Sequence, residues 1–407
     1  MRLVLALFLL CATASAQSSA LSSQVDGMLA SLSRITGWKV KHKVPSEILT
    51  KAKFSKLVAE GIADAEGSKE TRAAELTLKM FGLVPWDYNL ARESGELIEE
   101  QAAAFYDIKK KRLFMLDSVA DGPQQRVALA HELAHALADQ QFDLRKYIED
   151  AKDDDASTAR QSVIEGQASW LSWAFMSEQA GGRAEVPLAL LDQLSDVGAT
   201  GEGYPVLERT PLYMRESLTF PYTEGMRFQD SIYRKLGAAA FDRIFRDAPL
   251  STQEIIHPEA YADALKPTHP ELPKPTKGLR LLADGDVGEF DYSAMLRQFT
   301  DDVEGRRVAR EWRGASYQLY EDKATKAPLL THLSEWSSPQ AARDFFRVYL
   351  EVLQAKWKRF DVGQKSELEV TGTGDRGDFV LRISGSSVLS VEGILASPNK
   401  RLAGTVK

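Results

Sequence analysis

The stretch VALAHELAHALAD, residues 127–139, sets two histidines and a glutamate among apolar residues. His131 and His135 are four residues apart, so on a helix both rings lie on the same face and reach one metal ion. His131, Glu132 and His135 together form the H-E-x-x-H pattern of zinc sites. The apolar surroundings predict a buried helix, and burial of three polar groups is costly unless a ligand such as a metal satisfies them. The stretch therefore predicts a Zn²⁺ site at the centre of the fold.

The segment before this helix predicts a β-hairpin. QAAAFYD (101–107) and RLFML (112–116) are rich in strand-forming residues and flank the basic turn at 108–111. Gly122-Pro123 then predicts the start of the motif helix, because proline is tolerated at a first helical position. We expect this helix to run to about Gln140.

A catalytic zinc needs a third protein ligand and an open position for water. A second long helix is predicted at about 157–178, and Glu165 on it is the best candidate. Gly166 and Ala168 beside it are small, which would let two helix backbones approach closely. The aspartates at 153–155 are rivals, but they fall in an acidic loop where solvated charge is the ordinary interpretation.

His131-Glu132-x-x-His135 followed by Glu165-Gly166-x-Ala168 resembles the gluzincin metallopeptidases, the thermolysin-like group. The longer string HELAHALADQQFDL (131–144), with FPYTEG (220–225) and STQEIIHPEAY (251–261), resembles a family of exported bacterial proteins of that kind. The resemblance covers about residues 100–262. It implies a zincin-like fold and peptide hydrolysis with Glu132 as the general base.

The sequence differs from two known zinc peptidase patterns, and these differences limit which family the chain can resemble. A metzincin would have glycine at 138 and histidine at 141, where this chain has Ala138 and Gln141, so that class is excluded. Thermolysin-like enzymes carry an aspartate four residues beyond the glutamate ligand, where Ser169 stands here. The partners that orient the histidines are therefore unassigned, with Asp139 and Asp143 as candidates.

A peptidase also needs a donor to the oxyanion of the tetrahedral intermediate. The resemblance points to a downstream histidine or tyrosine, which leaves His257, Tyr222 and Tyr261, with His257 preferred. The predicted strand around 103–105 has two interpretations: an edge strand that pairs with an extended substrate, or an ordinary inner strand.

The pattern of the chain predicts an α+β protein: a mostly helical domain with a small sheet, for which the resemblance implies a zincin-like catalytic fold, followed by a separate α+β domain. We expect a signal peptide at 1–16, the catalytic domain at 17–261, a linker at 262–280 that carries most of a proline cluster, and a C-terminal domain at 281–407. Within the catalytic domain, residues 17–33 predict a loose helix. Residues 38–44 predict a strand, and 47–65 and 68–81 predict helices. Residues 17–95 fit an integral lobe better than a removable pro-segment.

Composition limits the classes of function. The net charge is −7, and −8 once Arg2 is removed with the signal peptide, which argues against nucleic acid as a partner. The only cysteine, Cys11, lies in the signal peptide, so neither disulfides nor thiolate chemistry is expected in the mature chain. No segment of the mature chain is apolar enough to span a membrane, and the oligomeric state is open.

The sequence thus predicts an exported zinc metallopeptidase, periplasmic or extracellular, acting on peptide or protein substrates. The competing hypothesis is a cell-envelope binding or assembly protein that keeps the zincin fold with little proteolysis. Glu132 favours the enzyme, because a binding protein has no need of a general base.

Overall fold

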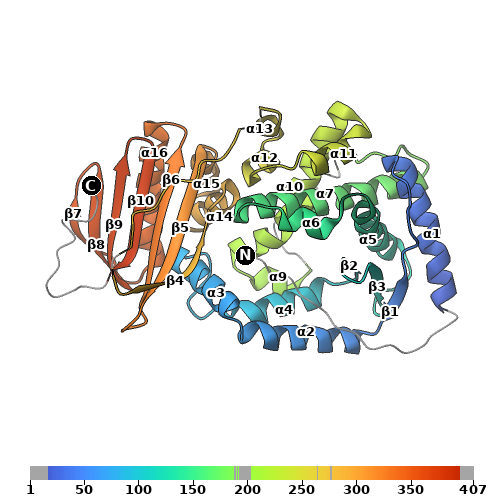
Figure 1. The fold of residues 1–407 in the computed structure, drawn as a ribbon, viewed down its shortest axis with the longest axis horizontal. Coiled ribbons are helices and arrows are strands. Elements are labelled where there is room, and N and C mark those ends of the chain that lie inside the picture. The colour runs from blue at the N-terminus through green and yellow to red at the C-terminus, as the bar shows by residue number, and fades with distance from the viewer. Residues whose placement is uncertain are drawn as a thin grey trace.

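A computed structural model describes residues 17–187, 189, 191, 203–263, 265–275 and 277–394. The expected signal peptide at 1–16 lies outside them. Figure 1 shows an α+β chain in two parts, which we call the helical lobe (17–263) and the sheet lobe (279–394). No helix in these described ranges is both long and apolar enough to cross a membrane.

The elements of the helical lobe are α1 (Gln17–Thr36), β1 (Ser46–Leu49), α2 (Lys51–Glu66), α3 (Lys69–Phe81), α4 (Leu90–Gln101), β2 (Ala104–Asp107), β3 (Arg112–Leu116), α5 (Pro123–Phe142), α6 (Leu144–Glu149), α7 (Asp154–Gln179), α9 (Pro205–Arg209), α10 (Leu212–Leu236), α11 (Ala239–Arg246), α12 (Thr252–Ile256) and α13 (Pro258–Asp263). The elements of the sheet lobe are β4 (Leu279–Gly285), α14 (Glu289–Phe299), α15 (Asp302–Ala309), β5 (Trp312–Asp322), β6 (Pro328–Trp336), α16 (Pro339–Lys356), β7 (Asp361–Lys365), β8 (Glu369–Gly374), β9 (Gly377–Ser384) and β10 (Ser387–Ile394).

The helical lobe contains a three-stranded sheet in the order β1-β3-β2. β2 and β3 pair antiparallel, with Phe105 opposite Phe114, which confirms the predicted hairpin. β1 joins the other side of β3 in parallel. β2 is therefore an edge strand, and α5 packs beside it.

The predicted strand at 38–44 is wrong, since β1 begins only at Ser46. Its alternation reflects the burial of Trp38 and Val44 in the helical lobe. Two backbone N–H groups of this segment donate to the side-chain oxygen of Gln140, instead of to a neighbouring strand.

The segment at 17–33 is helical as predicted, but the helix is packed in the core and is not loose. α1 is a continuous helix that lies against α5, and Val25, Leu29 and Leu32 are buried in the core. Packing of an apolar face stabilises a helix whose local signals are weak.

Besides α1, the long helices in the described part of the lobe are α5, α7 and α10. α5 begins at Pro123 as predicted, and α7 covers the predicted second helix with a start three residues earlier. In the sequence, FPYTEG (220–225) predicts the start of another helix, but it lies in the middle of α10, which continues through Pro221. α7 packs against both α5 and α10, so it is the central helix of the lobe.

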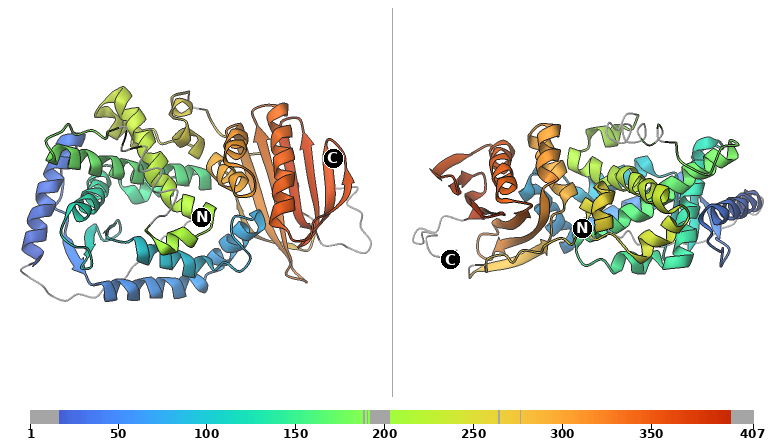
Figure 2. Two further views of the ribbon diagram at one scale, coloured as in Figure 1. Left: turned by 180° about the vertical axis from the view of Figure 1, so that it is seen from behind. Right: turned by 90° about the horizontal axis from the view of Figure 1, so that it is seen from above.

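The sheet lobe is a seven-stranded antiparallel sheet in the order β4-β5-β6-β10-β9-β8-β7. In the sequence, alternating runs at 317–320, 329–333, 367–370, 379–383 and 388–391 predict strands, and Ser338-Pro339 predicts the start of a helix. Strands are present at or overlapping all five runs, and α16 has Ser338 as its N-cap. α16 lies along one face of the sheet, and α14 and α15 lie between the sheet and the helical lobe (Figure 2).

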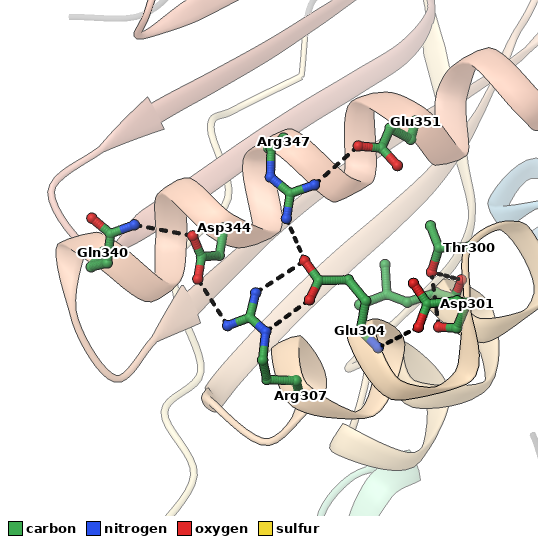
Figure 3. A network of polar contacts seen from close by, with 9 residues as sticks. Thr300, Asp301, Glu304, Arg307, Gln340, Asp344, Arg347 and Glu351 are labelled. Carbon is green, nitrogen blue, oxygen red and sulfur yellow. Dashed lines mark hydrogen bonds and ion pairs between the residues drawn. The ribbon is translucent and has the colours of Figure 1, made fainter.

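Ion pairs join α15 to α16 at the surface (Figure 3). The Glu304 carboxylate accepts two bonds from Arg307, at 2.8 and 3.0 Å, and also pairs with Arg347. Arg307 reaches on to Asp344 at 3.0 Å. These bonds from arginine hold the pKa of Glu304 at about 2. The arginines are half exposed, so the pairs orient the helices with modest energy.

The core of the sheet lobe includes residues from the helical lobe. Leu78, Phe81, Val84 and Leu90 are buried in the same cluster as side chains of α14, α16 and the sheet. Part of the predicted linker lies along the sheet lobe, because the Thr268 N–H donates to the Arg313 carbonyl at 2.8 Å. Both sides of the predicted linker therefore contribute to one core.

Candidate metal centre

Three side chains from α5 and α7 converge in the helical lobe, and we call them the triad: His131, His135 and Glu165. The Nε2 atoms of the two histidines are 3.0 Å apart. Glu165 Oε2 lies 3.1 Å from Nε2 of His131 and 3.3 Å from Nε2 of His135. The histidine side chains are 13% and 11% exposed and that of Glu165 is 26% exposed, so the triad is sheltered but reachable from solvent.

The triad fits a tetrahedral zinc ion. Bonds of about 2.0–2.1 Å in a tetrahedron keep ligand atoms about 3.3 Å apart, and the three separations here are 3.0, 3.1 and 3.3 Å. One donor atom each from His131, Glu132 and His135 also lie within 4.8 Å of one another. The set with Glu165 is tighter, so Glu165 is the better third ligand. Two nitrogens and one oxygen are a donor set that zinc accepts.

The two glutamates have different electrostatic surroundings. Burial works to raise the pKa of Glu165, but the neighbouring charge of His135 and the bonds from both histidines outweigh it and hold the pKa below its usual value. Burial raises the pKa of Glu132 to about 7, although the Tyr106 N–H donates to its Oε2 at 2.7 Å. Glu165 is thus kept ionised beside the histidines, and Glu132 is the carboxyl that exchanges a proton more readily.

The hairpin is fixed to α5 through Tyr106 on β2. Its backbone N–H binds Glu132, and its hydroxyl donates to Asp139 at 2.8 Å. Lys111, in the hairpin turn, donates to Asp139 at 2.7 Å. Glu132 and Asp139 are seven residues apart and so lie on one face of α5. These contacts place the free edge of β2 beside Glu132.

Asp139 and Asp143 were the candidates for orienting the histidines, but both side chains bind other groups. Asp139 is occupied by the hairpin and by the Leu144 N–H, and Asp143 accepts from the Lys146 N–H as the N-cap of α6. Ser169 lies nearest to the outer nitrogen of His131, with Oγ 3.5 Å from Nδ1. A serine therefore stands where thermolysin-like sites were expected to have an aspartate.

The close helix approach predicted at Gly166 involves a different helix. A Cβ at Gly166 would lie 2.0 Å from the carbonyl carbon of Gly225, which is on α10 and not on α5. The two glycines bring α10 against α7 one residue after Glu165. This contact carries Tyr222 toward the triad.

The aspartates at 153–155 belong to the start of α7 and not to a solvated loop. Asp153 is the N-cap and accepts from the Ala156 N–H at 2.7 Å. Asp155 is 2% exposed and accepts from the N–H and hydroxyl of Thr252. Negative charge at a helix N-terminus is favourable, and these residues stand about three turns from Glu165. They are not rivals for the third ligand.

Of the three candidate donors, Tyr222 is the one beside the triad. Its ring stacks on the ring of His131, with 5.7 Å between the two centroids. The negative charge of Glu165 raises the pKa of Tyr222 well above its usual value, although the residue is 41% exposed. Tyr222 thus presents a protonated hydroxyl at the triad.

His257 and Tyr261 are engaged elsewhere. His257 Nε2 lies 2.8 Å from Glu289 Oε1 at the start of α14. The Tyr261 hydroxyl donates to the Asp247 carbonyl at 2.7 Å. Among the described residues, neither has a contact with the triad.

Sequence reasoning missed Tyr106 and Lys111. The spacing of Glu132 and Asp139 along α5 was a usable signal, because two acids on one face of a buried helix require partners. The basic turn of the preceding hairpin was the nearest source of such partners.

A family model described as a domain of unknown function, DUF8575, matches residues 280–402. No curated protein and no solved structure matches the chain. The matched segment belongs to the C-terminal part of the chain and does not contain the triad.

Proposed function

We propose that this chain is an exported zinc-dependent metallopeptidase of the gluzincin kind, with His131, His135 and Glu165 as the metal ligands. The observation that carries the proposal is the convergence of these three donor atoms at 3.0–3.3 Å, next to the partly open carboxyl of Glu132. A structural zinc site usually closes with four protein ligands. Here three donors leave one side for water or substrate.

The roles of the residues follow from their positions. Zinc, when bound, would supply a Lewis acid that polarises a carbonyl and lowers the pKa of a water molecule. Glu132 accepts the proton of the attacking water and delivers it to the leaving amine. Tyr222 donates its hydroxyl to the developing oxyanion.

The free edge of β2 supports a peptide as the substrate. An edge strand offers unpaired backbone groups that bind an extended chain by main-chain hydrogen bonds. Tyr106 on β2 lies directly against Glu132, so a peptide held on this edge passes the general base. The resemblance of residues 131–144 to exported proteins supports action outside the cytoplasm, where N-terminal sequencing of the secreted protein should find Gln17 first.

The test is to replace Glu132 by Gln in the full-length mature chain. We expect zinc at one ion per chain by elemental analysis in both the wild type and Glu132→Gln. Cleavage of a mixed peptide library should be present in the wild type and lost in the variant. Glu149→Gln, an exposed substitution on α6, is the matched control and should cleave like the wild type.

Two results would contradict the proposal. Cleavage by Glu132→Gln at the wild-type rate would remove Glu132 as the base. Zinc binding without cleavage by the wild type would favour the binding or assembly role instead.

A further inference from the structure

A cavity of about 870 Å³ lies where the two lobes meet. Its walls are α2 and α3 on one side, the first turns of α7 and α10 on another, and β4, α14 and Tyr317 of the sheet lobe on the third. Figure 1 shows these elements around the middle of the molecule. The volume is in the range of ligand sites and accommodates several side chains of a bound peptide.

The cavity leads toward the triad along α7. Asp154, Thr158 and Gln161 line it at spacings of four and three, and Glu165 is the next residue on the same helical face. Asp154 and Glu165 are about 16 Å apart along the axis. On α10 the lining ends at Pro221, and the next residue is Tyr222. The lining of the cavity therefore ends one helical turn before Glu165 and one residue before Tyr222.

The lining carries only negative charge. None of the described lining residues is lysine, arginine or histidine. The carboxylates that line it are Glu60, Asp64, Glu70, Asp154, Asp286 and Asp291. The first three stand exposed on α2 and α3, and the last three are partly buried where α7 meets α14.

The three partly buried carboxyl groups, Asp154, Asp286 and Asp291, lie close to one another. Burial and the charges of Asp153, Asp154 and Asp291 raise the pKa of Asp286 to about 7. Their oxygens accept hydrogen bonds from the protein: Asp286 from the Asp154 and Asp155 N–H groups, and Asp291 from Gly288 N–H and Tyr213. Because a raised pKa favours the protonated carboxyl, the charge that the cavity offers to a ligand comes mainly from the exposed carboxylates of α2 and α3, Glu60, Asp64 and Glu70.

The carboxylates of the cavity do not form a site for a metal ion. Within the described residues, the groups of three His or Glu side chains close enough to hold an ion lie at the triad and Glu132, and no such spacing is found among the carboxylates of this cavity. The remaining lining is apolar or aromatic, including Leu57, Phe81, Phe290 and Tyr317. A lysine or arginine side chain suits both features, because its alkyl stem packs on apolar surface while its charged end meets carboxylates.

We infer that this cavity binds the part of a peptide substrate that extends to one side of the scissile bond, and that it selects lysine or arginine there. The inference rests on the proposed function for the position of the scissile bond. An extended peptide advances about 3.3 Å per residue, so about five residues span the distance from Glu165 to Asp154. The preferred basic residues lie about three to five positions from the bond.

The test measures binding separately from cleavage. The full-length zinc-loaded Glu132→Gln protein, which leaves peptides intact, is titrated with a fluorescent alanine-rich peptide that carries two lysines, and with the same peptide carrying two glutamines. Fluorescence anisotropy at low salt gives the two dissociation constants. We expect the lysine peptide to bind about tenfold more tightly, and the preference to shrink in high salt.

Two double variants test whether the preference for lysine comes from the carboxylates of the cavity. Glu60→Gln with Asp64→Asn removes two exposed carboxylates of the cavity, and Glu149→Gln with Asp150→Asn makes the same change of charge on α6, outside the cavity. All four residues are exposed, so little loss of stability is expected. We expect the first pair to abolish most of the tenfold preference and the second pair to keep it.

Equal binding of the two peptides would overturn the inference. So would an equal loss in both paired variants, because the preference would then reflect net charge alone. A lysine preference that maps to the cavity, in a wild type that cleaves no peptide, would support the cavity and contradict only the proposed hydrolysis.

Discussion

Gly166 on α7 and Gly225 on α10 lie in direct backbone contact, since a Cβ at Gly166 would meet the Gly225 carbonyl carbon at 2.0 Å. The contact comes one residue after Glu165 and three residues after Tyr222. It is the point where the proposed metal ligand on one helix and the proposed oxyanion donor on the other are brought together.

Gly166→Ala should force α7 and α10 apart. No flexible side chain stands in the way to yield, so we expect a loss of about 3 kcal/mol in the free energy of unfolding, measured in urea. Zinc affinity should fall as well, because Glu165 moves with α7. Gly27→Ala on α1 is the control: nothing lies within 4 Å of its Cβ, and alanine should stabilise the helix by up to about 1 kcal/mol. Equal effects of both changes would contradict the close contact.

Tyr222→Phe should lower kcat by about a hundredfold while the zinc content stays at one ion per chain, because only the donor to the oxyanion is lost. His257→Phe should leave kcat nearly unchanged, since His257 pairs with Glu289 away from the triad. Steady-state kinetics with elemental analysis decides between them. A larger fall in kcat for His257→Phe would restore the preference first drawn from the sequence.

Stability should depend on pH through Asp286. Burial and three neighbouring aspartates raise its pKa from 3.8 to about 7, so the folded chain keeps a proton that the unfolded chain has lost. The resulting stabilisation is complete below pH 3.8 and disappears as the pH rises through 7. Asp286→Asn should therefore raise Tm relative to the wild type by a few degrees more at pH 8 than at pH 5. The same change at exposed Asp361 should give no such difference between the two pH values.

Lys356 and Glu392 form a buried ion pair, with side chains 3% and 1% exposed and 2.8 Å between Nζ and Oε2. Lys356→Met leaves the Glu392 carboxylate buried without its partner and should cost about 3–5 kcal/mol. Adding Glu392→Gln to that variant should recover much of the loss, because an amide is cheaper to bury than a charge. Urea unfolding of both variants measures this. No recovery in the double variant would mean that packing of the lysine stem dominates.

Local signals account for what could be predicted. The helix from Pro123, the hairpin before it and the cap at Ser338 follow from proline, alternation and serine within a few residues of each element. Glu165 could be proposed because its helix follows the motif helix at a suitable distance, and the structure places it within 3.3 Å of both histidines.

Long-range contacts account for the rest. The segment at 38–44 alternates like a strand, yet its N–H groups bind Gln140, about a hundred residues away. The partner of Gly166 is on α10, and nothing near Gly166 in the sequence indicates Gly225. Tyr222 could be proposed as a candidate, but it could not be chosen over His257 before both were placed.

Because α3 shares a core with the sheet lobe, cleavage of the chain between the two lobes should not separate them. Lys356 donates to the Met80 carbonyl at 3.0 Å, and Leu78 and Phe81 are buried among side chains of the sheet lobe. A protease that nicked the proline-rich stretch at 265–275 would thus cut a connection without separating the pieces. The two fragments should elute together as a noncovalent complex, and either one alone would expose the apolar surface that the other normally covers.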